Sequence, residues 1–212
     1  MMDHHTSRPA APPRSDPWLL LAEMEHRVIN EYAVAISTIS AAASRSSDAD
    51  VRATLADAAR RLGRYAAAHR ALQLPTAGGS LDLSEYLRRL CVARTEAGLA
   101  ERGIQLILIE QQVSLEAERC WRVGLVVSEL ITNAMRHAFT GEAGDRDPVI
   151  VVELGVAGGA IQVRVSDNGR AAEACARGSG SMIVDALAAD LRGYVERSFG
   201  ETGGSVLLWV PI

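Results

Sequence analysis

A polar stripe within an otherwise apolar segment constrains this chain more than any other feature. Residues 129–137 read Glu-Leu-Ile-Thr-Asn-Ala-Met-Arg-His, so Glu129, Asn133 and His137 follow one another at intervals of four residues. Side chains at this spacing line one face of an α-helix and can converge on one ligand. A carboxylate, a carboxamide and an imidazole stand where a core helix would carry leucine. The stripe favours a binding site over the bland alternative of a solvated helix face.

Two glycine-containing turns follow the stripe and suggest what the ligand is. Asp167 and Gly169 end an alternating apolar run, and Gly178 and Gly180 precede another helix-like segment. Asp167 can accept a hydrogen bond from an exocyclic amine such as that of adenine, and Gly169 would let a ring approach the backbone. Backbone N–H groups at a glycine turn before a helix suit phosphates. Together these residues predict the walls of a nucleotide pocket.

The stripe itself suits a triphosphate bound with Mg²⁺. Asn133 offers a neutral oxygen ligand to the metal, which prefers oxygen in octahedral geometry. Glu129 is placed to polarise a water or accept a proton. Arg136 and His137 are placed to meet phosphate oxygens.

The first third of the chain predicts a helical hairpin. Asp16-Pro17 is a good helix start, and apolar residues then step by three and four up to about Ser46. A polar break at 44–50 separates this run from a heptad seam that begins at Val51. The two seams consist of Leu21, Met24, Val28, Tyr32, Ala35 and Ile39, and of Val51, Leu55, Ala58, Leu62, Tyr65, His69 and Leu72. Two helices bury little, so a dimer forming a four-helix bundle is expected.

The remainder predicts an α+β fold with helices on one face of a largely antiparallel sheet. A linker spans 74–80. The expected helices are 82–101, 117–139 and 181–192, and the expected strands are 104–110, 149–155, 160–166, 193–199 and 204–211.

Composition excludes several classes of protein. The net charge of −4 gives no basic field for nucleic acid, and no apolar run is long enough to span a membrane. The three cysteines form no Cys-x-x-Cys pair, which favours reduced thiols over a disulfide or zinc site. Residues 1–16, with His4 and His5, are typical of a disordered arm. We therefore expect a cytoplasmic protein that receives any stimulus from another chain.

The order of the motifs resembles the N, G1 and G2 boxes of the Bergerat-fold (GHKL) ATPases, especially sensor histidine kinases. In addition, residues 23–30, Glu-Met-Glu-His-Arg-Val-Ile-Asn, resemble the phosphoacceptor box of HWE and HisKA_2 kinases. The resemblance covers roughly residues 20–212. It implies three parts: the arm 1–16, a dimerisation and phosphotransfer hairpin at 17–74, and an ATP-binding domain at 80–212.

The resemblance also implies roles for single residues. His26 would accept the phosphoryl group, and Glu129 would assist catalysis. Asn133 would bind Mg²⁺, and ATP would be held by Asn133, Arg136, His137, Asp167, Gly169, Gly178 and Gly180. His26 lies roughly 140–200° around the helix from Leu21, Met24 and Val28, so it should point to solvent. Its neutral imidazole is a competent nucleophile, with Glu25 or Asn30 to orient it and Arg27 to balance charge.

The implied partners are the receiver domain of a response regulator, a second copy of the chain and a possible separate sensor protein. The sequence also departs from the family pattern. Ala171 replaces the second glycine of the G1 box, and only eight residues separate Gly169 from Gly178, which leaves a short lid. These departures keep open a phosphorelay histidine phosphotransferase that does not bind ATP. A third alternative is a GHKL serine kinase or anti-sigma-type switch, which would not need the histidine hairpin.

Overall fold

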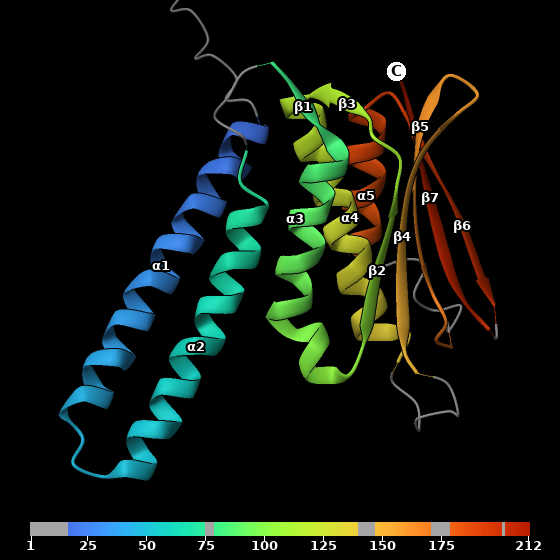
Figure 1. The fold of residues 1–212 in the computed structure, drawn as a ribbon. Coiled ribbons are helices and arrows are strands. Elements are labelled where there is room, and N and C mark those ends of the chain that lie inside the picture. Colours follow the sequence, from blue (N-terminus) through green and yellow to red (C-terminus); the bar gives the residue numbers. More distant parts are fainter. Residues whose placement is uncertain (1–16, 75–78, 140–146, 171–178, 201) are drawn as a thin grey trace, which may run out of the picture.

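The computed structural model describes residues 17–74, 79–139, 147–170, 179–200 and 202–212. Helices α1 (Pro17–Arg45) and α2 (Ala49–Ala71) run antiparallel and form the predicted hairpin (Figure 1). The carboxylate of Asp48 accepts hydrogen bonds from the N–H groups of Asp50 and Val51 and so caps α2. The expected helix at 17–46 and the polar break are therefore confirmed.

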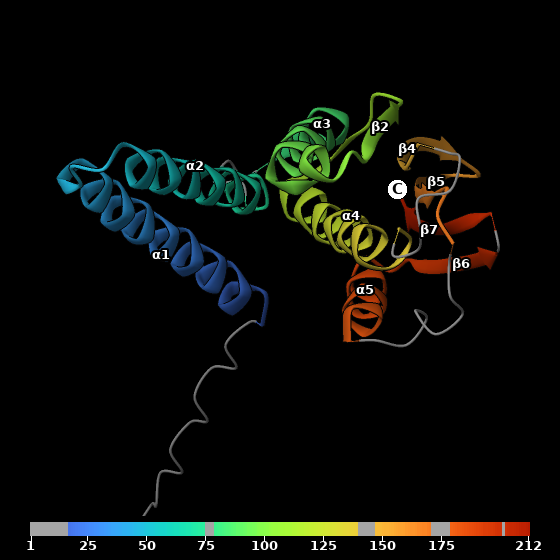
Figure 2. The ribbon, with the colours of Figure 1, turned by 90° about the horizontal axis from the view of Figure 1, so that it is seen from below.

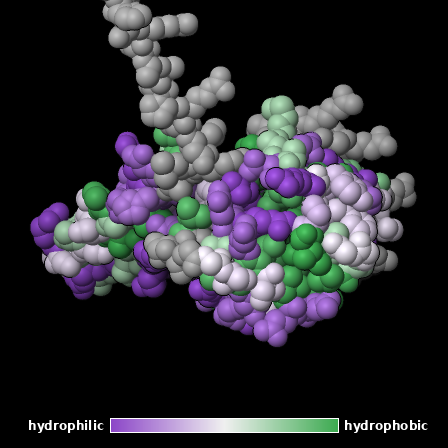
Figure 3. All heavy atoms as spheres, turned by 90° about the horizontal axis from the view of Figure 1, so that it is seen from above, coloured by the Kyte–Doolittle hydropathy of each residue, from purple (hydrophilic) through white to green (hydrophobic). Residues whose placement is uncertain are grey.

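Several apolar side chains of the hairpin lie outside its own seam and are exposed. Val28, Tyr32 and Ile39 are half-buried, as the periodicity predicts. Met24, also predicted in the seam, is instead 62% exposed, and Val34 is 67% exposed. Two helices cannot surround every apolar position, because each helix covers only one side of its neighbour. In the view from above, apolar and hydrophilic residues are interspersed along the hairpin, and a larger apolar patch lies on the rest of the molecule (Figure 3).

The second part of the chain is the predicted α+β unit. Its five-stranded sheet has the order β2-β4-β5-β7-β6, in which β2 is parallel to β4 and the other neighbours are antiparallel. Helices α3 (Leu83–Arg94), α4 (Ala117–His137) and α5 (Ser179–Asp190) cover one face (Figures 1 and 2). The strands are β2 (Gln105–Glu110), β4 (Val149–Ala157), β5 (Ala160–Asp167), β6 (Tyr194–Gly200) and β7 (Gly203–Pro211).

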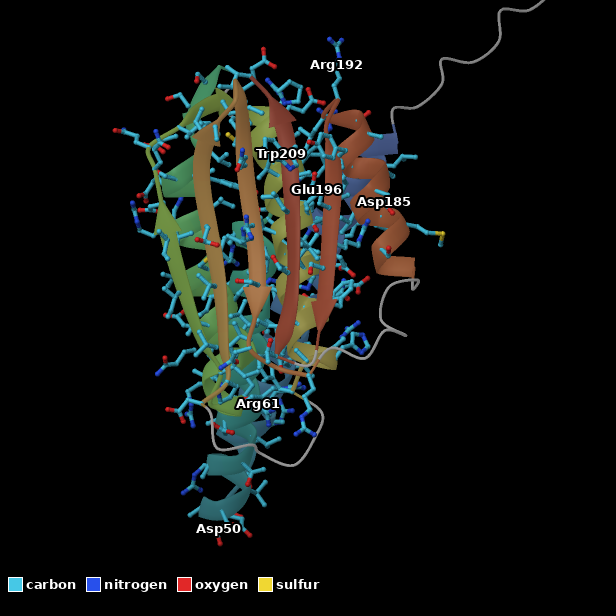
Figure 4. The ribbon with its side chains drawn as sticks, turned by 90° about the vertical axis from the view of Figure 1, so that its right-hand side faces the viewer. Asp50, Arg61, Asp185, Arg192, Glu196 and Trp209 are labelled. Atoms are coloured by element: carbon cyan, nitrogen blue, oxygen red, sulfur yellow. The ribbon has the colours of Figure 1, made fainter. Side chains whose placement is uncertain are left out.

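One face of the sheet is buried against the helices, and the other face points outward. Ile161, Val163 and Val165 point into the helices and are no more than 4% exposed, as their alternation predicts. The other face looks outward, with Trp209 and Glu196 on the neighbouring strands β7 and β6 (Figure 4). The helices thus cover a single face, and the functional residues must lie at its edges or between helix and sheet.

One predicted helix is shorter than expected. The segment 82–101 begins as predicted, with Asp82 capping α3 through the N–H groups of Ser84 and Glu85. The α-helix ends at Arg94 and continues as a π-turn over Thr95–Leu99 and a 3₁₀ turn over Ala100–Arg102. Gly98 adopts φ 172°, a non-helical backbone angle, so regular i→i−4 bonding cannot continue. The short pair β1 (Ser80–Asp82) and β3 (Ser114–Glu116) was not predicted.

The hairpin docks on α3 through small residues. Ala68 of α2 is buried together with Ala93 and Ala97, which lets the helix backbones approach closely. Beyond this contact, the indole Nε1 of Trp121 donates a hydrogen bond of 2.7 Å to the Leu72 carbonyl, where α2 ends. The junction is therefore packed and hydrogen-bonded. No helix in the described part of the chain is long and apolar enough to cross a bilayer.

The two cysteines in the described part of the chain are reduced thiols, as expected. Cys91 and Cys120 are free and buried, and burial raises the pKa of each thiol, to about 12 and about 11 respectively. Cys175, like the arm at 1–16, lies outside the described residues.

Candidate nucleotide-binding site

A pocket opens between the C-terminal half of α4, the sheet and α5. Asn133 and His137, two members of the polar stripe, both line it, as does Asp167 at the end of β5. It encloses about 660 Å³, including its open mouth. The complete lining is Leu130, Asn133, Ala134, His137, Ala138, Val165, Asp167, Ser181, Val184, Arg197, Phe199, Gly204, Ser205 and Val206. Apolar walls with a few polar groups are typical of a small-ligand site.

Glu129, the third member of the stripe, lies one turn above Asn133 against the start of α5. A β-carbon built on Gly180 would lie 2.1 Å from Glu129 Oε1 and 3.4 Å from Asn133 Nδ2. The stripe and the glycine turn, which are 47 residues apart from Asn133 to Gly180 in the sequence, therefore meet in space. Only glycine fits at position 180 with Glu129 in this place.

Asp167 is held in place by backbone donors. Its Oδ1 accepts hydrogen bonds from the N–H groups of Gly169 (3.0 Å) and Gly204 (3.2 Å). Burial raises the pKa of this carboxyl above its ordinary value, and the two backbone hydrogen bonds oppose the shift. A half-buried carboxylate that lines a pocket is suited to accept a hydrogen bond from a ligand N–H donor.

The other two residues of the Asp-Asn-Gly turn serve the fold. Asn168 bonds to the Val149 N–H and the Asp147 carbonyl, both at 2.8 Å, and so ties the turn to the start of β4. A β-carbon on Gly169 would lie 2.2 Å from the Ala138 carbonyl oxygen. Glycine is thus needed where the turn crosses the end of α4. Gly169 is not among the pocket-lining residues, and Gly178 lies outside the described residues.

The sequence motifs missed part of the lining. Arg197 of β6 reaches the pocket and pairs with Asp185 of α5 at 2.8 Å, and Phe199 and Ser205 add to the wall. No short motif marks these residues, because they come from strands that pair only in the folded sheet. Arg136 was predicted to meet phosphates, but it is exposed and is not among the pocket-lining residues.

His26 lies on α1 and is exposed to solvent, as its position on the helix predicts. Its Nδ1 lies 3.3 Å from the Asn30 carboxamide nitrogen, one turn further along. Arg27 pairs with Glu23 at 2.6 Å. Glu25 turns inward, and burial raises the pKa of its carboxyl to about 7, while the charge of Arg94 acts to lower it. Of the two residues expected to orient the ring, Asn30 makes the contact.

The second histidine of the hairpin is in a different environment. His69 is half-buried against the ring of Tyr32, with ring centroids 5.5 Å apart. Burial and the charge of Arg94 both lower the pKa of its imidazole. It thus packs in the seam between the two helices, as its heptad position predicts.

Comparisons with known proteins agree with this arrangement. Residues 23–97 match the family model HisKA_2, described as histidine kinase, and residues 100–203 match a histidine kinase-like ATPase domain. Together the two models span both halves of the chain in the order of the hairpin and the pocket. The chain therefore carries a HisKA_2-type histidine kinase segment followed by a histidine kinase-like ATPase domain.

Individual histidine kinases also resemble this chain in sequence and in structure. It is 30% identical over 205 residues to blue-light-activated histidine kinase 2 of Erythrobacter litoralis, covering 91% of the chain but 57% of that relative. The histidine kinase domain of the E. litoralis EL346 kinase has a TM-score of 0.58 at 28% identity, with 90% and 92% of the two chains covered. A bacterial phosphotransferase shares the fold alone, with a TM-score of 0.63 at 12% identity over 95% of this chain and all of that one.

Proposed function

We propose that this kinase core phosphorylates its own His26 from ATP and passes the phosphoryl group to an aspartate of a response regulator. The observation that supports this most is the convergence of Asn133, His137 and Asp167 on one pocket. In addition, α1 carries His26, which is exposed to solvent as a phosphoacceptor would need to be. We further propose that the hairpin at 17–74 and the unit at 80–212 act as the phosphotransfer and ATP-binding domains.

The lining fits an adenine nucleotide. Asp167 would accept a hydrogen bond from the exocyclic amine, while Val165 and Val184 pack against the ring. His137 and Arg197 would face the phosphates, with Gly180 offering its backbone at the start of α5. Arg136, which is exposed outside the pocket lining, and Gly178, which lies outside the described residues, remain proposed phosphate contacts.

Mg²⁺ would be held by Asn133 together with phosphate oxygens. Among the described residues no group of three or more His, Cys, Asp or Glu side chains could hold a metal, which suits an ion delivered with the nucleotide. When bound, Mg²⁺ neutralises charge that builds up on the phosphates. Glu129, above Asn133, would orient the metal's water shell or accept a proton.

The chemistry at His26 depends on its tautomer. Nucleophilic attack by Nε2 requires a proton on Nδ1, and the Asn30 carboxamide can accept that hydrogen bond through its oxygen after a half-turn of the amide. Nε2 then forms the bond to the γ-phosphorus, and the bond to the β–γ bridging oxygen breaks. ADP leaves with that electron pair, and the proton stays on Nδ1.

The acceptor and the donor site are apart in this arrangement. His26 is not among the residues that line the pocket, and α1 lies at the opposite side of the molecule from the sheet (Figures 1 and 2). Transfer therefore requires the hairpin to move, or the pocket of a partner subunit to serve it.

We also propose that the chain forms a homodimer through its hairpin. Leu20, Met24 and Val34 are exposed by 48%, 62% and 67% and lie within about 80° of one another around α1. Covering this face with the same face of a second hairpin would form a four-helix bundle and remove it from water. The exposed hairpin surface around His26 would remain for the receiver domain.

The test uses γ-labelled ATP with Mg²⁺ on the wild type, His26→Ala and Asn133→Ala. The proposal expects acid-labile label in the wild type only. Asn133→Asp is a matched variant of similar size. It keeps the volume that Asn133→Ala removes and places a negative charge beside the phosphates. Absence of label in the wild type, with His26-dependent uptake from a phosphorylated receiver, would select the relay. Label that persists in His26→Ala would contradict both.

A further inference from the structure

Arg94 occupies an unusual place at the junction of the hairpin and the ATPase unit. It is the last residue of α3, and the π-turn Thr95–Leu99 follows it directly. Single π-turns inside helices are frequent at functional sites. The guanidinium is largely buried, and one Nη donates a hydrogen bond to Ser128 Oγ on α4. Its Nε has no hydrogen-bond partner among the described residues.

A buried guanidinium needs compensating charge. Two carboxylates supply it here: Glu25 on α1 and Glu129 on α4 both favour the charged form of Arg94. Neither makes an ion pair within 4.0 Å with Arg94 in the described part of the chain. The interaction therefore acts through space across a junction from which water is largely excluded, where charges are weakly screened.

Glu25 faces several titratable groups from the elements packed around it. Arg94 and Tyr86 approach from α3, and the Glu25 charge helps to raise the pKa of Tyr86, whose main cause is burial. His69 on α2 senses the same Arg94 charge. Glu25 Oε2 and the Tyr86 hydroxyl are both buried without a hydrogen-bond partner among the described residues. These side chains form a polar cluster with incomplete hydrogen bonding at the interface between the hairpin and the ATPase unit.

Residues of this cluster are direct sequence neighbours of residues in both functional sites. Glu25 directly precedes His26, and Ser128 directly precedes Glu129. Glu129 in turn lies against Gly180 beside Asn133 in the pocket. One cation therefore connects the helix that carries the acceptor with the helix that carries the nucleotide-site carboxylate and amide.

We propose that Arg94 is a positioning residue that couples docking of the His26 helix to the state of the nucleotide site, through Glu25 on one side and Ser128 with Glu129 on the other. The part that involves nucleotide rests on the proposed function. The docking part stands on the cluster alone.

The sign of the pH effect follows from Glu25. Its pKa in the docked arrangement, about 7, is above the 4.5 of an unburied glutamate. Docking is therefore fully favoured below the lower value and weakens as pH rises through the upper one, by at most about tenfold per pH unit. His69 has the opposite sign, since its lowered pKa disfavours the docked form at acid pH, so the two must be separated by substitution.

The experiment measures the distance between spin labels on α1 and β6. Ser40→Cys and Ser198→Cys are exposed sites, and Cys175→Ser removes a competing thiol, while Cys91 and Cys120 are buried. Labelled chains are diluted into excess unlabelled protein so that only distances within one chain are read. We expect the docked fraction of the wild type to fall from pH 6 to pH 8. Glu25→Gln, which stays neutral, should remain docked, and Glu23→Gln on the same helix should behave as the wild type.

Variants at Arg94 give the specific signature. Arg94→Met removes the charge that lowers the Glu25 pKa, so the midpoint of undocking should move to higher pH. Arg94→Lys keeps the charge and should leave the midpoint near its wild-type value. A pH-independent wild-type distance, a Glu25→Gln profile that matches the wild type, or an Arg94→Met midpoint at or below the wild-type value would each overturn the proposal.

A final arm adds Mg·ADP, with binding followed separately by titration calorimetry. Coupling between sites is reciprocal, so bound nucleotide should shift the midpoint in the wild type and not in Arg94→Met. Nucleotide that binds without shifting the midpoint overturns the coupling. A pocket that takes up no nucleotide contradicts the proposed function instead and leaves the pH result standing.

Discussion

Gly180 and Glu129 are in such close contact that no side chain fits between them. A β-carbon on Gly180 would lie 2.1 Å from Glu129 Oε1. The start of α5 therefore sets the position of the α4 carboxylate beside Asn133, and the two helices form one wall of the pocket.

Gly180→Ala should displace Glu129 or tilt α5. The Glu129 carboxylate is the end of a flexible side chain and can shift at little cost to folding, so we expect nucleotide affinity to fall with little change in the free energy of unfolding. Calorimetric titration with Mg·ADP and urea denaturation measure the two quantities. Gly63→Ala is the control, because no atom lies within 4 Å of the added carbon on α2. It should stabilise the protein by about 0.5–1 kcal/mol. Equal effects of the two substitutions would refute the packing argument.

Asp167 should make adenine binding sensitive to acid. Burial holds the pKa of this carboxyl above its ordinary value, so it protonates at a higher pH than an exposed aspartate. Protonation removes the negative charge and turns one oxygen into a donor, which makes the group a weaker acceptor for the adenine amine, so affinity should fall as pH is lowered through the raised pKa. Folding stability from this group has the opposite sign, because a raised pKa favours the folded state at low pH.

The measurement is the affinity for ADP between pH 4.5 and pH 7.5, with Asp167→Asn as the matched control. The Asp167→Asn variant should bind ADP more weakly than the wild type, and its affinity should not change with pH over this range. An unchanged slope in Asp167→Asn would remove this carboxyl as the cause.

Trp121 ties the end of the hairpin to the ATPase unit. Its Nε1 donates to the Leu72 carbonyl at 2.7 Å in a buried setting. Trp121→Phe leaves that carbonyl unpaired and should cost about 1–3 kcal/mol of unfolding free energy. Trp209→Phe should cost much less, since the Trp209 Nε1 has no hydrogen-bond partner within the described residues. Equal losses in urea denaturation would show that the hydrogen bond contributes little.

The apolar face of α1 should decide the oligomeric state. Met24→Asp together with Val34→Asp places two charges on this face, and light scattering should then report a monomer where the wild type is a dimer. Arg60→Asp, on an exposed site of α2 paired with Asp57, tests whether any added negative charge has the same effect. A monomeric wild type at micromolar concentration would rule out the dimer.

Periodicity and spacing were enough to predict most of the architecture. The hairpin, the helix that carries the stripe and the alternating strand at Ile161 follow from local patterns, since each buries one face of a regular element. The helix expected through residue 101 was wrong beyond Arg94, where the backbone of Gly98 interrupts it. Short strands such as Ser80–Asp82 carry too few residues for a pattern.

The site was predictable where its residues share one helix or one turn. Asn133, His137 and Asp167 were expected together and do line one pocket. Arg197 could not be found in this way, because strand pairing brings it to the pocket from a distant part of the sequence. Arg94 could not be found either, because only the packing of the helices brings it to the junction of the hairpin and the ATPase unit. Gly169 was predicted to let a ring approach the backbone; it is not among the pocket-lining residues, and an added β-carbon would meet the Ala138 carbonyl.

The most direct test of the central claim is to map the phosphoryl group by tandem mass spectrometry at neutral pH after incubation with Mg·ATP. We predict a phosphoryl group on the imidazole of His26 that is lost on brief acid treatment and is absent from Asn133→Ala. A modified residue other than His26, or an unmodified His26 in protein that demonstrably binds ATP, would contradict it.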